Sequence, residues 1–321
     1  LLVSYIYPAQ NVDWLNSLAK RYPELTVLAM DCVPRITRAQ KLDSLSSMAN
    51  ISGYRAVMEA FQYFQRCPKP MITAAGKMPP ANVLVIGAGV AGLAAIGYCK
   101  NLGCVVKAID PSRAAREQAE SMGAEFVTVP VQEEGTGIGG YAKEMSDSYK
   151  KAQYELTKKT AMEVDIVITT ALIPGRPAPK LLDESIISSM KPGSVIVDMA
   201  AEMGGKTSLT RPDEVYVTEN SISIVGFSDL ASRMAPQSSE LYSNNLWHLM
   251  DEMGGAEKFH VNPKDEIISG MLVVNQGEMT WKPLEARQPP QQPSQQPPQQ
   301  APQQPAQPAD RPSVREKKEK P

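Results

Sequence analysis

Histidine is scarce in this sequence, and several other marks of common protein classes are missing. The 321 residues contain two histidines and four cysteines, and no two cysteines form a C-x-x-C pair, so we expect no metal site. The cysteines are interpreted as buried or incidental thiols of a reducing compartment. No apolar run reaches the ~18 residues that a membrane-spanning helix needs.

The chain also lacks a large excess of positive or negative charge. The net charge is -2 and the pI is about 5.9, so nothing favours nucleic acid or an anionic membrane surface as a partner. Hydrophobic residues make up 42% of the chain, which is enough for a large core. The length predicts about two domains.

Apolar strand-like segments alternate with helical ones from residue 81 onward. The strand candidates are ANVLVI, VVKAID, AEFVTV, VDIVITTALI, GSVIVDMA and ISIVGFSDL. Such alternation predicts an α/β fold with a parallel sheet covered on both faces. Before it, we expect strands in LLVSYIY and LTVLAMDCVP, a helix in VDWLNSLAKRYP, a long helix over about 39–65 and a turn-rich connector over 69–80. A further helix is expected in SSELYSNNLWHLMDEM.

The segment GAGVAG fits the G-x-G-x-x-G fingerprint of a dinucleotide site, because it follows the strand VLVI and opens a helical segment. Gly87 would permit the tight turn, Gly89 would let a pyrophosphate approach the backbone, and Gly92 would let helix pack on strand. The N–H groups around Val90 would face the phosphates. Asp110 ends the next strand and suits ribose hydroxyls, which favours NAD over NADP.

Two more segments are expected near this crevice. Thr170, Ala171 and Leu172 follow the strand VDIVIT, where a strand end would meet the nucleotide. Gly140 and Tyr141 interrupt a polar stretch. Glycines beside a tyrosine suit a mobile lid over a bound nucleotide, and they suit an ordinary flexible loop equally well.

The stretch PRITRAQKLDSLSSMANISGYRAV poses a chemical question. It places an arginine, an amide, a carboxylate and a hydroxyl close together, at Arg35, Gln40, Asp43 and Ser46, with no histidine nearby. By spacing alone these residues are either an active-site group or the capping and surface residues of a helix start.

Several long segments together carry a family resemblance. PRITRAQKLDSLSSMANISGYRAV, ITAAGKMPPANVLVIGAGVAGLAAI, GGYAKEMSD, ITTALIPGRPAPKLL and MKPGSVIVDMAAEMGG resemble the NAD-binding domain I, in the alpha subunit, of proton-translocating NAD(P) transhydrogenase. The resemblance covers about Leu1 to Trp281. It implies a Rossmann-type doubly wound parallel sheet plus part of a second α/β domain built from both chain ends.

The resemblance implies a function that needs no proton-transfer base. NAD(H) would bind this chain, and NADP(H) would bind a partner domain or the beta subunit. Hydride would pass directly between the two nicotinamides, coupled to proton translocation by a membrane domain. A homodimer is implied too, lying peripherally on the cytoplasmic face of the inner membrane or on the mitochondrial matrix side.

The same resemblance assigns roles to the polar stretch. It implies that the loop and helix start hold the nicotinamide and its ribose, through Arg35, Ile36, Thr37, Gln40, Asp43 and Ser46. Two rings that exchange a hydride need only to be held and oriented. No residue is therefore expected to act as an acid or base.

Two alternatives stay open. One is an amino-acid oxidoreductase of the alanine dehydrogenase type, a related class that carries a catalytic His where this chain has Tyr7 and an Asp where it has Glu202. Oxidation of an amine needs a proton-transfer group beside the hydride donor, so Tyr7 argues against it. The other is a non-catalytic NAD-binding module.

We expect four segments along the chain. Residues 1–45 would be the remnant of an N-terminal α/β domain, because the chain begins without Met in a strand-like run. Residues 46–235 would be the Rossmann NAD-binding domain, and 236–285 a return helix that completes the first domain. Residues 286–321, rich in Pro and Gln, would be a disordered linker or tail.

Overall fold

The computed structural model describes residues 1–131, 133, 135, 145–170 and 180–282. The chain divides into two units, Leu1–Trp281 and Lys282–Pro321. The account below concerns the first unit, and the division of residues 1–285 into three segments remains a prediction. Among the described helices, none is both long and apolar enough to cross a membrane.

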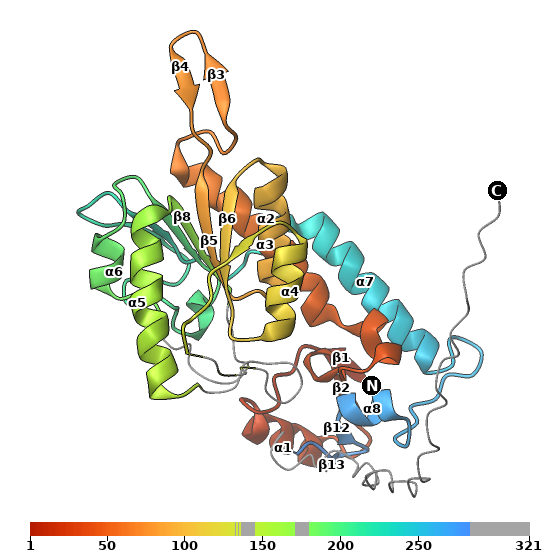
Figure 1. Cartoon of the computed structure of the whole chain (residues 1–321). Coiled ribbons are helices and arrows are strands. Elements are labelled where there is room, and N and C mark those ends of the chain that lie inside the picture. Colours follow the sequence, from red (N-terminus) through yellow and green to blue (C-terminus); the bar gives the residue numbers. More distant parts are fainter. Residues whose placement is uncertain (132, 134, 136–144, 171–179, 283–321) are drawn as a thin grey trace, which may run out of the picture. The chain divides into compact units, whose positions relative to one another are not determined.

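A seven-stranded sheet forms the larger part of the described chain (Figure 1). Its order is β10-β11-β9-β8-β5-β6-β7, and only the β10–β11 pair is antiparallel. From β7 to β11 this is the doubly wound order 3-2-1-4-5-6. The bounds are β5 Asn82–Ile86, β6 Val105–Ile109, β7 Glu125–Phe126, β8 Ile166–Thr169, β9 Val195–Asp198, β10 Val215–Val217 and β11 Ser223–Val225.

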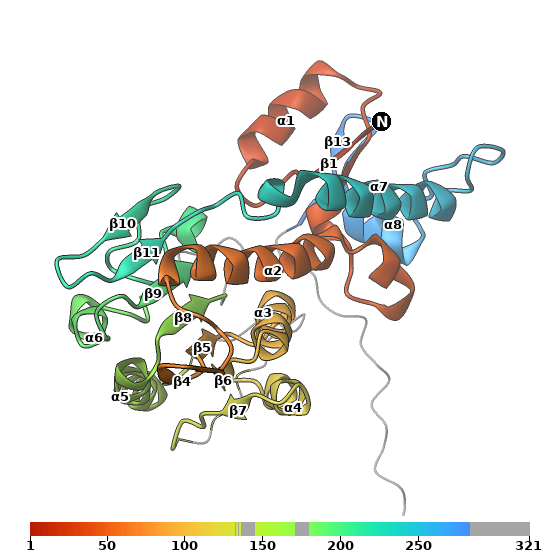
Figure 2. The same ribbon diagram turned by 90° about the horizontal axis from the view of Figure 1, so that it is seen from above.

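Helices cover both faces of this sheet (Figure 2). One face carries α2 (Ser44–Phe64), α3 (Val90–Asn101) and α4 (Arg113–Ser121). The other carries α5 (Asp147–Glu163) and α6 (Glu184–Ser188). The arrangement explains the uninterrupted apolar strands, because each strand has no face left for water.

Alternate residues of the central strands enter two different cores. In β5, Val83 and Val85 pack under α2 and α3, while Leu84 and Ile86 pack against the opposite layer. Every one of these side chains is buried. The predicted α/β class and parallel sheet are therefore confirmed.

A second, four-stranded sheet joins the two ends of the described chain. Its order is β1-β2-β12-β13, with β1 Leu2–Ser4 parallel to β2 Val27–Ala29, and β12 Leu272–Asn275 antiparallel to both β2 and β13 Glu278–Met279. The helices α1 (Val12–Arg21) and α8 (Glu266–Met271) belong to this part of the chain. This sheet confirms the predicted second α/β layer built from both chain ends.

The helix α7 (Ala235–Glu252) packs along α2 (Figure 2). Asn245 of α7 donates to the Lys41 carbonyl at 2.9 Å. Among the described residues, four short helices are of the 3-10 type: η1 Met30–Cys32, η2 Thr37–Leu42, η4 Ala201–Met203 and η5 Ser232–Met234. The helix expected over SSELYSNNLWHLMDEM is thus confirmed.

Two local expectations were wrong. The helix expected over about 39–65 is divided, because the Asp43 side chain caps a new helix, α2, after the 3-10 turn η2. The connector expected over 69–80 is a hairpin in which β3 (Met71–Thr73) pairs with β4 (Gly76–Met78). Gly76 adopts φ +127°, which only glycine tolerates well, and this closes the turn.

Candidate functional site

The glycine loop joins β5 to α3 through a sharp turn. Gly87 has φ +99°, in the region that glycine alone adopts without strain. A Cβ on Gly92 would lie 1.9 Å from the Gly87 oxygen, so only glycine lets α3 start this close to β5. A Cβ on Gly89 would meet nothing within 4 Å, and both Gly89 and Val90 are exposed.

Asp110 holds this loop in place. Its carboxylate accepts a hydrogen bond from the Ala88 N–H at 2.7 Å and one from the Ser112 N–H at 2.8 Å. The expected position beside the fingerprint is therefore confirmed. Its bond to a ribose stays a prediction, and a carboxylate oxygen can accept more than one hydrogen bond. Burial, then Asp110 and Glu133, raise the pKa of Tyr149 to about 12.

Thr170 completes the loop from the neighbouring strand. Its hydroxyl donates to the Gly87 carbonyl at 2.7 Å, and its N–H donates to the Ile86 carbonyl at 2.9 Å. The end of β8 thus supports the fingerprint turn. The contact of Thr170 with the nucleotide stays a prediction. Four other predicted site residues lie outside the described residues: Gly140, Tyr141, Ala171 and Leu172.

The start of α2 brings two of the four polar residues together. Asp43 is the N-cap residue, and its carboxylate accepts from the Ser46 N–H at 2.9 Å and from the Ser46 hydroxyl at 2.6 Å. Capping alone explains this pair. Gln40 lies in η2, where its carbonyl accepts from the Asp43 N–H at 3.2 Å and its side chain is exposed.

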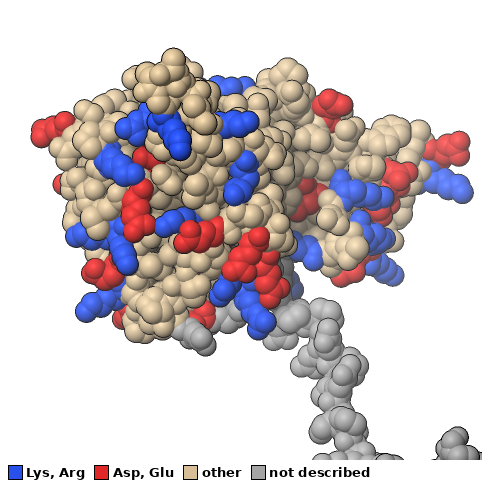
Figure 3. Space-filling model, turned by 45° about the horizontal axis from the view of Figure 1, so that its top comes forward, with Lys and Arg blue, Asp and Glu red and all other residues tan. Residues whose placement is uncertain are grey.

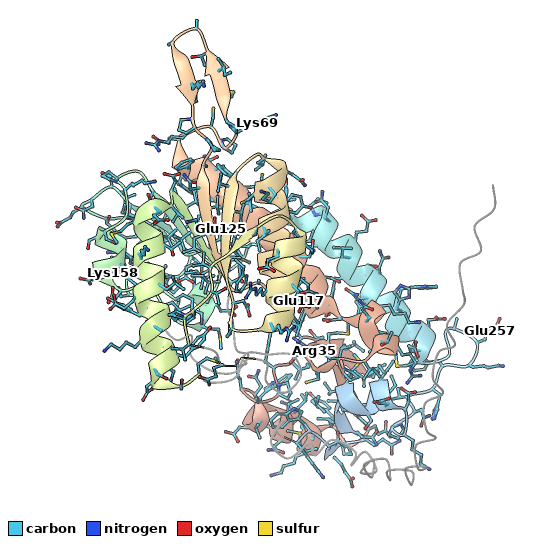
Figure 4. The ribbon with its side chains drawn as sticks, in the orientation of Figure 1. Arg35, Lys69, Glu117, Glu125, Lys158 and Glu257 are labelled. Atoms are coloured by element: carbon cyan, nitrogen blue, oxygen red, sulfur yellow. The ribbon has the colours of Figure 1, made fainter. Side chains whose placement is uncertain are left out.

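The residues before η2 differ in burial. Arg35 and Thr37 are exposed, whereas Ile36 is half-buried and packs against the core of the four-stranded sheet. Figure 4 labels Arg35 on the N-terminal part of the chain, well away from Lys69 at the base of the β3–β4 hairpin. The side chain of Arg35 thus reaches the surface, while that of Ile36 has a structural role.

Asp198, which the sequence reasoning missed, anchors the segment after β9. This fully buried carboxylate receives five donors: the hydroxyls of Thr169 and Thr210 and the N–H groups of Ala200, Lys206 and Thr207. Asp198 ends the apolar strand GSVIVD just as Asp110 ends VVKAID. The same signal was therefore present in the sequence.

Lys206 lies beside Asp198 with only 1% of its surface exposed. Its ammonium makes no hydrogen bond or ion pair with any residue that the structure describes. Burial lowers the pKa of Lys206 to about 8, opposed by Asp198 and assisted by Lys180. Lys180 itself donates to the carbonyls of Gly204 and Thr207.

Three tyrosines form a column between the N-terminal loop and α7. The rings of Tyr5 and Tyr7 stack with centroids 6.1 Å apart, and those of Tyr5 and Tyr242 with centroids 5.5 Å apart. Asp31 fixes the loop by accepting from the N–H groups of Ile6 at 2.7 Å and Tyr7 at 3.0 Å. This column was not predicted.

The charged side chains on the face drawn in Figure 3 are of both signs. On the face drawn in Figure 3, Lys and Arg are interspersed with Asp and Glu, and the described residues form no broad area of one sign. Within the described ranges, no group of three or more His, Cys, Asp or Glu residues is placed to hold a metal ion.

Comparison with known proteins identifies the family. The family described as "Alanine dehydrogenase/PNT, C-terminal domain" matches residues 56–282. The chain belongs to the alanine dehydrogenase/PNT family. It is 51% identical over 286 residues to the NAD(P) transhydrogenase subunit alpha of Cereibacter sphaeroides, covering 88% of this chain and 54% of that protein.

Two further members of the alanine dehydrogenase/PNT family extend the likeness. The NAD(P) transhydrogenase subunit alpha of Haemophilus influenzae is 50% identical over 279 residues, covering 86% of this chain and 54% of that protein. The crystal structure of transhydrogenase from Sinorhizobium meliloti superposes with a TM-score of 0.76 at 39% identity, over 86% of this chain and 74% of that one. The resemblance found in the sequence is confirmed.

The chain spans about half the length of the Cereibacter sphaeroides and Haemophilus influenzae proteins. NAD binding is implied by the family, and the glycine loop fits it. The exposed backbone at Gly89 opens the twelve-residue helix α3, and a side chain there would meet no protein atom. An anionic pyrophosphate suits such a helix N-terminus.

Proposed function

We propose that this chain binds NAD(H) at the carboxyl edge of the seven-stranded sheet and presents its nicotinamide to NADP(H) on a partner. The observation that carries the proposal is the glycine loop, which Asp110 and Thr170 tie from the two neighbouring strands. Ligands of doubly wound sheets bind where the strand order reverses, and β5 with its neighbours β6 and β8 forms that point.

The residues of the loop have separate roles in this proposal. The N–H groups at Gly89 and Val90 bind the pyrophosphate at the N-terminus of α3. Asp110 accepts from the adenosine ribose hydroxyls and repels a 2′-phosphate, which favours NAD(H) over NADP(H). Thr170, Ala171 and Leu172, together with Gly140 and Tyr141, contribute further contacts to the nucleotide.

The polar stretch orients the nicotinamide. The exposed Arg35 and Gln40 suit its carboxamide, which both donates and accepts hydrogen bonds. Asp43 and Ser46 support this contact from the first turn of α2, and the backbone of Ile36 and Thr37 borders the ring. When bound, the nicotinamide supplies hydride chemistry, so the chain itself moves no proton at the reacting carbons.

The partners follow from the same proposal. NADP(H) is held by an NADP-binding domain or beta subunit, and a membrane domain couples the hydride transfer to proton translocation. This chain then lies peripherally at the cytoplasmic face of the inner membrane or at the mitochondrial matrix side.

A second copy of the chain completes the assembly as a homodimer. The β3–β4 hairpin supports this part, because an isolated two-stranded hairpin is marginal in water. Ile72 is 81% exposed on it, and Met71 is exposed as well. Sedimentation should give a dimer for the parent chain and a lower apparent mass for Ile72→Glu. An unchanged dimer would remove the hairpin from the interface.

Enzyme assays with two acceptors test the main proposal. NADH is mixed with an NADP analogue whose reduced form has its own absorbance, with and without the NADP-binding component. We expect turnover only in the complete mixture, and none with L-alanine and NAD⁺. Turnover of L-alanine would favour the alanine dehydrogenase type, and NADH binding without any turnover would favour a non-catalytic module.

A further inference from the structure

Tyr7 lies at one end of the three stacked tyrosines. Its ring stacks on Tyr5 at an interplanar angle of 15°, and Tyr5 stacks on Tyr242 at the same angle. In spite of this stacking, Tyr7 is 47% exposed. The column therefore offers a flat aromatic surface to a further planar group.

The loop holds this ring firmly. Tyr7 has φ +49°, which is uncommon for a residue with a side chain and persists where the surroundings fix it. Here the Asp31 carboxylate binds the N–H groups of both Ile6 and Tyr7. Asn11 adds bonds from its amide to the carbonyls of Ile6 at 2.8 Å and Tyr7 at 3.3 Å. The ring is thus presented in a preorganised orientation.

The column lies beside the polar stretch that the proposed function uses. Tyr5 packs against the core of the four-stranded sheet, as Ile36 and the buried Leu42 do. The Tyr5 hydroxyl is buried, and so is the Ser44 hydroxyl at the start of α2. The Tyr7 ring, which stacks on Tyr5, therefore lies near the residues that are proposed to hold the nicotinamide.

We propose that the exposed ring of Tyr7 stacks on the nicotinamide ring of the bound dinucleotide. The inference rests on the proposed function, and it adds a contact residue from the N-terminal loop. The oxidised nicotinamide carries a positive charge, which an aromatic face attracts. The reduced ring is neutral and gains only the stacking.

Binding and magnetic resonance measured together test the stacking. On titration with NAD⁺, the nicotinamide protons should shift upfield, as expected above a tyrosine ring, and should show Overhauser contacts to the Tyr7 ring protons in the unaltered chain. Tyr7→Phe should keep both effects, and Tyr7→Ala should remove the upfield shift and weaken NAD⁺ by about 3- to 10-fold. The control is Tyr22→Ala, which removes a tyrosine of the same exposure, 47%.

ADP-ribose separates this inference from the proposed function. It keeps the adenosine and pyrophosphate and lacks the nicotinamide, so Tyr7→Ala should bind it as the parent chain does. Equal loss for ADP-ribose and NAD⁺, or unshifted nicotinamide protons in the unaltered chain, would overturn the stacking. Failure of the parent chain to bind either ligand would instead overturn the proposed function.

Discussion

The two edges of the seven-stranded sheet hold their carboxylates in different ways. At the amino edge, Asp165 precedes β8 and accepts from the Asn82 N–H at 2.9 Å, and Lys191 and Arg66 pair with it at 3.1 and 3.7 Å. At the carboxyl edge, Asp198 is bound by hydroxyls and backbone N–H groups, and within the described residues it forms no ion pair.

The two edges of the sheet therefore have different roles. At the amino edge, cations neutralise the carboxylates. The nearby Lys107 ammonium lies 2.8 Å from the Glu163 carboxylate and neutralises it in the same way. The carboxylates of the carboxyl edge instead fix loop backbones, Asp110 the glycine loop and Asp198 the segment after β9. We infer that the first edge stabilises the fold, and that the second positions groups for a ligand.

Removal of each buried carboxylate should have the largest effect. Asp198→Ala leaves several buried hydrogen-bond donors without an acceptor and should lower the unfolding free energy by about 3–5 kcal/mol. It should also weaken NAD⁺ about tenfold or more, which is about 1.4 kcal/mol. Asp165→Ala should cost about 1–3 kcal/mol without changing NAD⁺ affinity, since its cations reach solvent. Urea unfolding and calorimetry measure both, and equal losses of affinity would erase the distinction between the edges.

Replacement of a loop glycine by alanine should have the second largest effect. Gly92→Ala forces a Cβ against the Gly87 oxygen and should lower the unfolding free energy by about 3 kcal/mol. The variant should also lose NAD⁺ binding. Gly89→Ala meets open space, so its melting temperature should match that of the parent chain while NAD⁺ weakens. If Gly89→Ala binds NAD⁺ normally, the pyrophosphate does not approach the backbone there.

Lys206 should make stability depend on alkaline pH. The pKa of Lys206 is about 8 in the fold against 10.5 ordinarily, so the unfolded chain binds more protons between these values. The unfolding free energy should therefore rise with pH from about 8 to about 10.5.

Lys206→Met should remove that rise and stabilise the chain at pH 7 by on the order of 2–3 kcal/mol. The control, Lys180→Met, removes an exposed ammonium that binds two carbonyls, and should keep the rise. Urea unfolding at several pH values measures both variants. An Lys206→Met chain with the parental pH profile would contradict the assignment.

Asp110→Asn should have the smallest effect of the four. It keeps one oxygen for the Ala88 N–H and loses the charge, so NADH should weaken by about 1–2 kcal/mol. The preference for NADH over NADPH should shrink with it. Calorimetric titration measures both ligands. Equal affinity of the parent chain for the two would refute the role of Asp110 in selecting the cofactor.

Local patterns in the sequence predicted most of the larger sheet. The fingerprint at Gly87 was recognisable because strand, turn and helix follow one another within a few residues. Asp110 was found by its distance along the chain. Asp198 carried a similar signal, yet its five donors come from segments up to 29 residues away and only the fold unites them.

The long-range contacts could not be predicted in this way. Tyr5 and Tyr242 stack although 237 positions separate them, so no periodicity relates them. The helix expected over about 39–65 is interrupted because the Asp43 carboxylate accepts a hydrogen bond from the Ser46 N–H and so caps a new helix. The hairpin strands β3 and β4 have three residues each, too short for an alternating pattern.

Transfer of an isotope label tests most directly the central claim, which is that the carboxyl edge of the seven-stranded sheet positions the nicotinamide ring and moves no proton. NADH deuterated stereospecifically at the transferred position is mixed with an NADP analogue, this chain and the isolated NADP-binding component. We expect the deuterium to arrive on the analogue without exchange with water, slowed by Arg35→Ala or Gln40→Ala by up to ~100-fold through misplacement of the ring. Washout of the label into solvent, or loss of turnover in a folded Tyr7→Phe chain, would show that a proton-transfer group takes part.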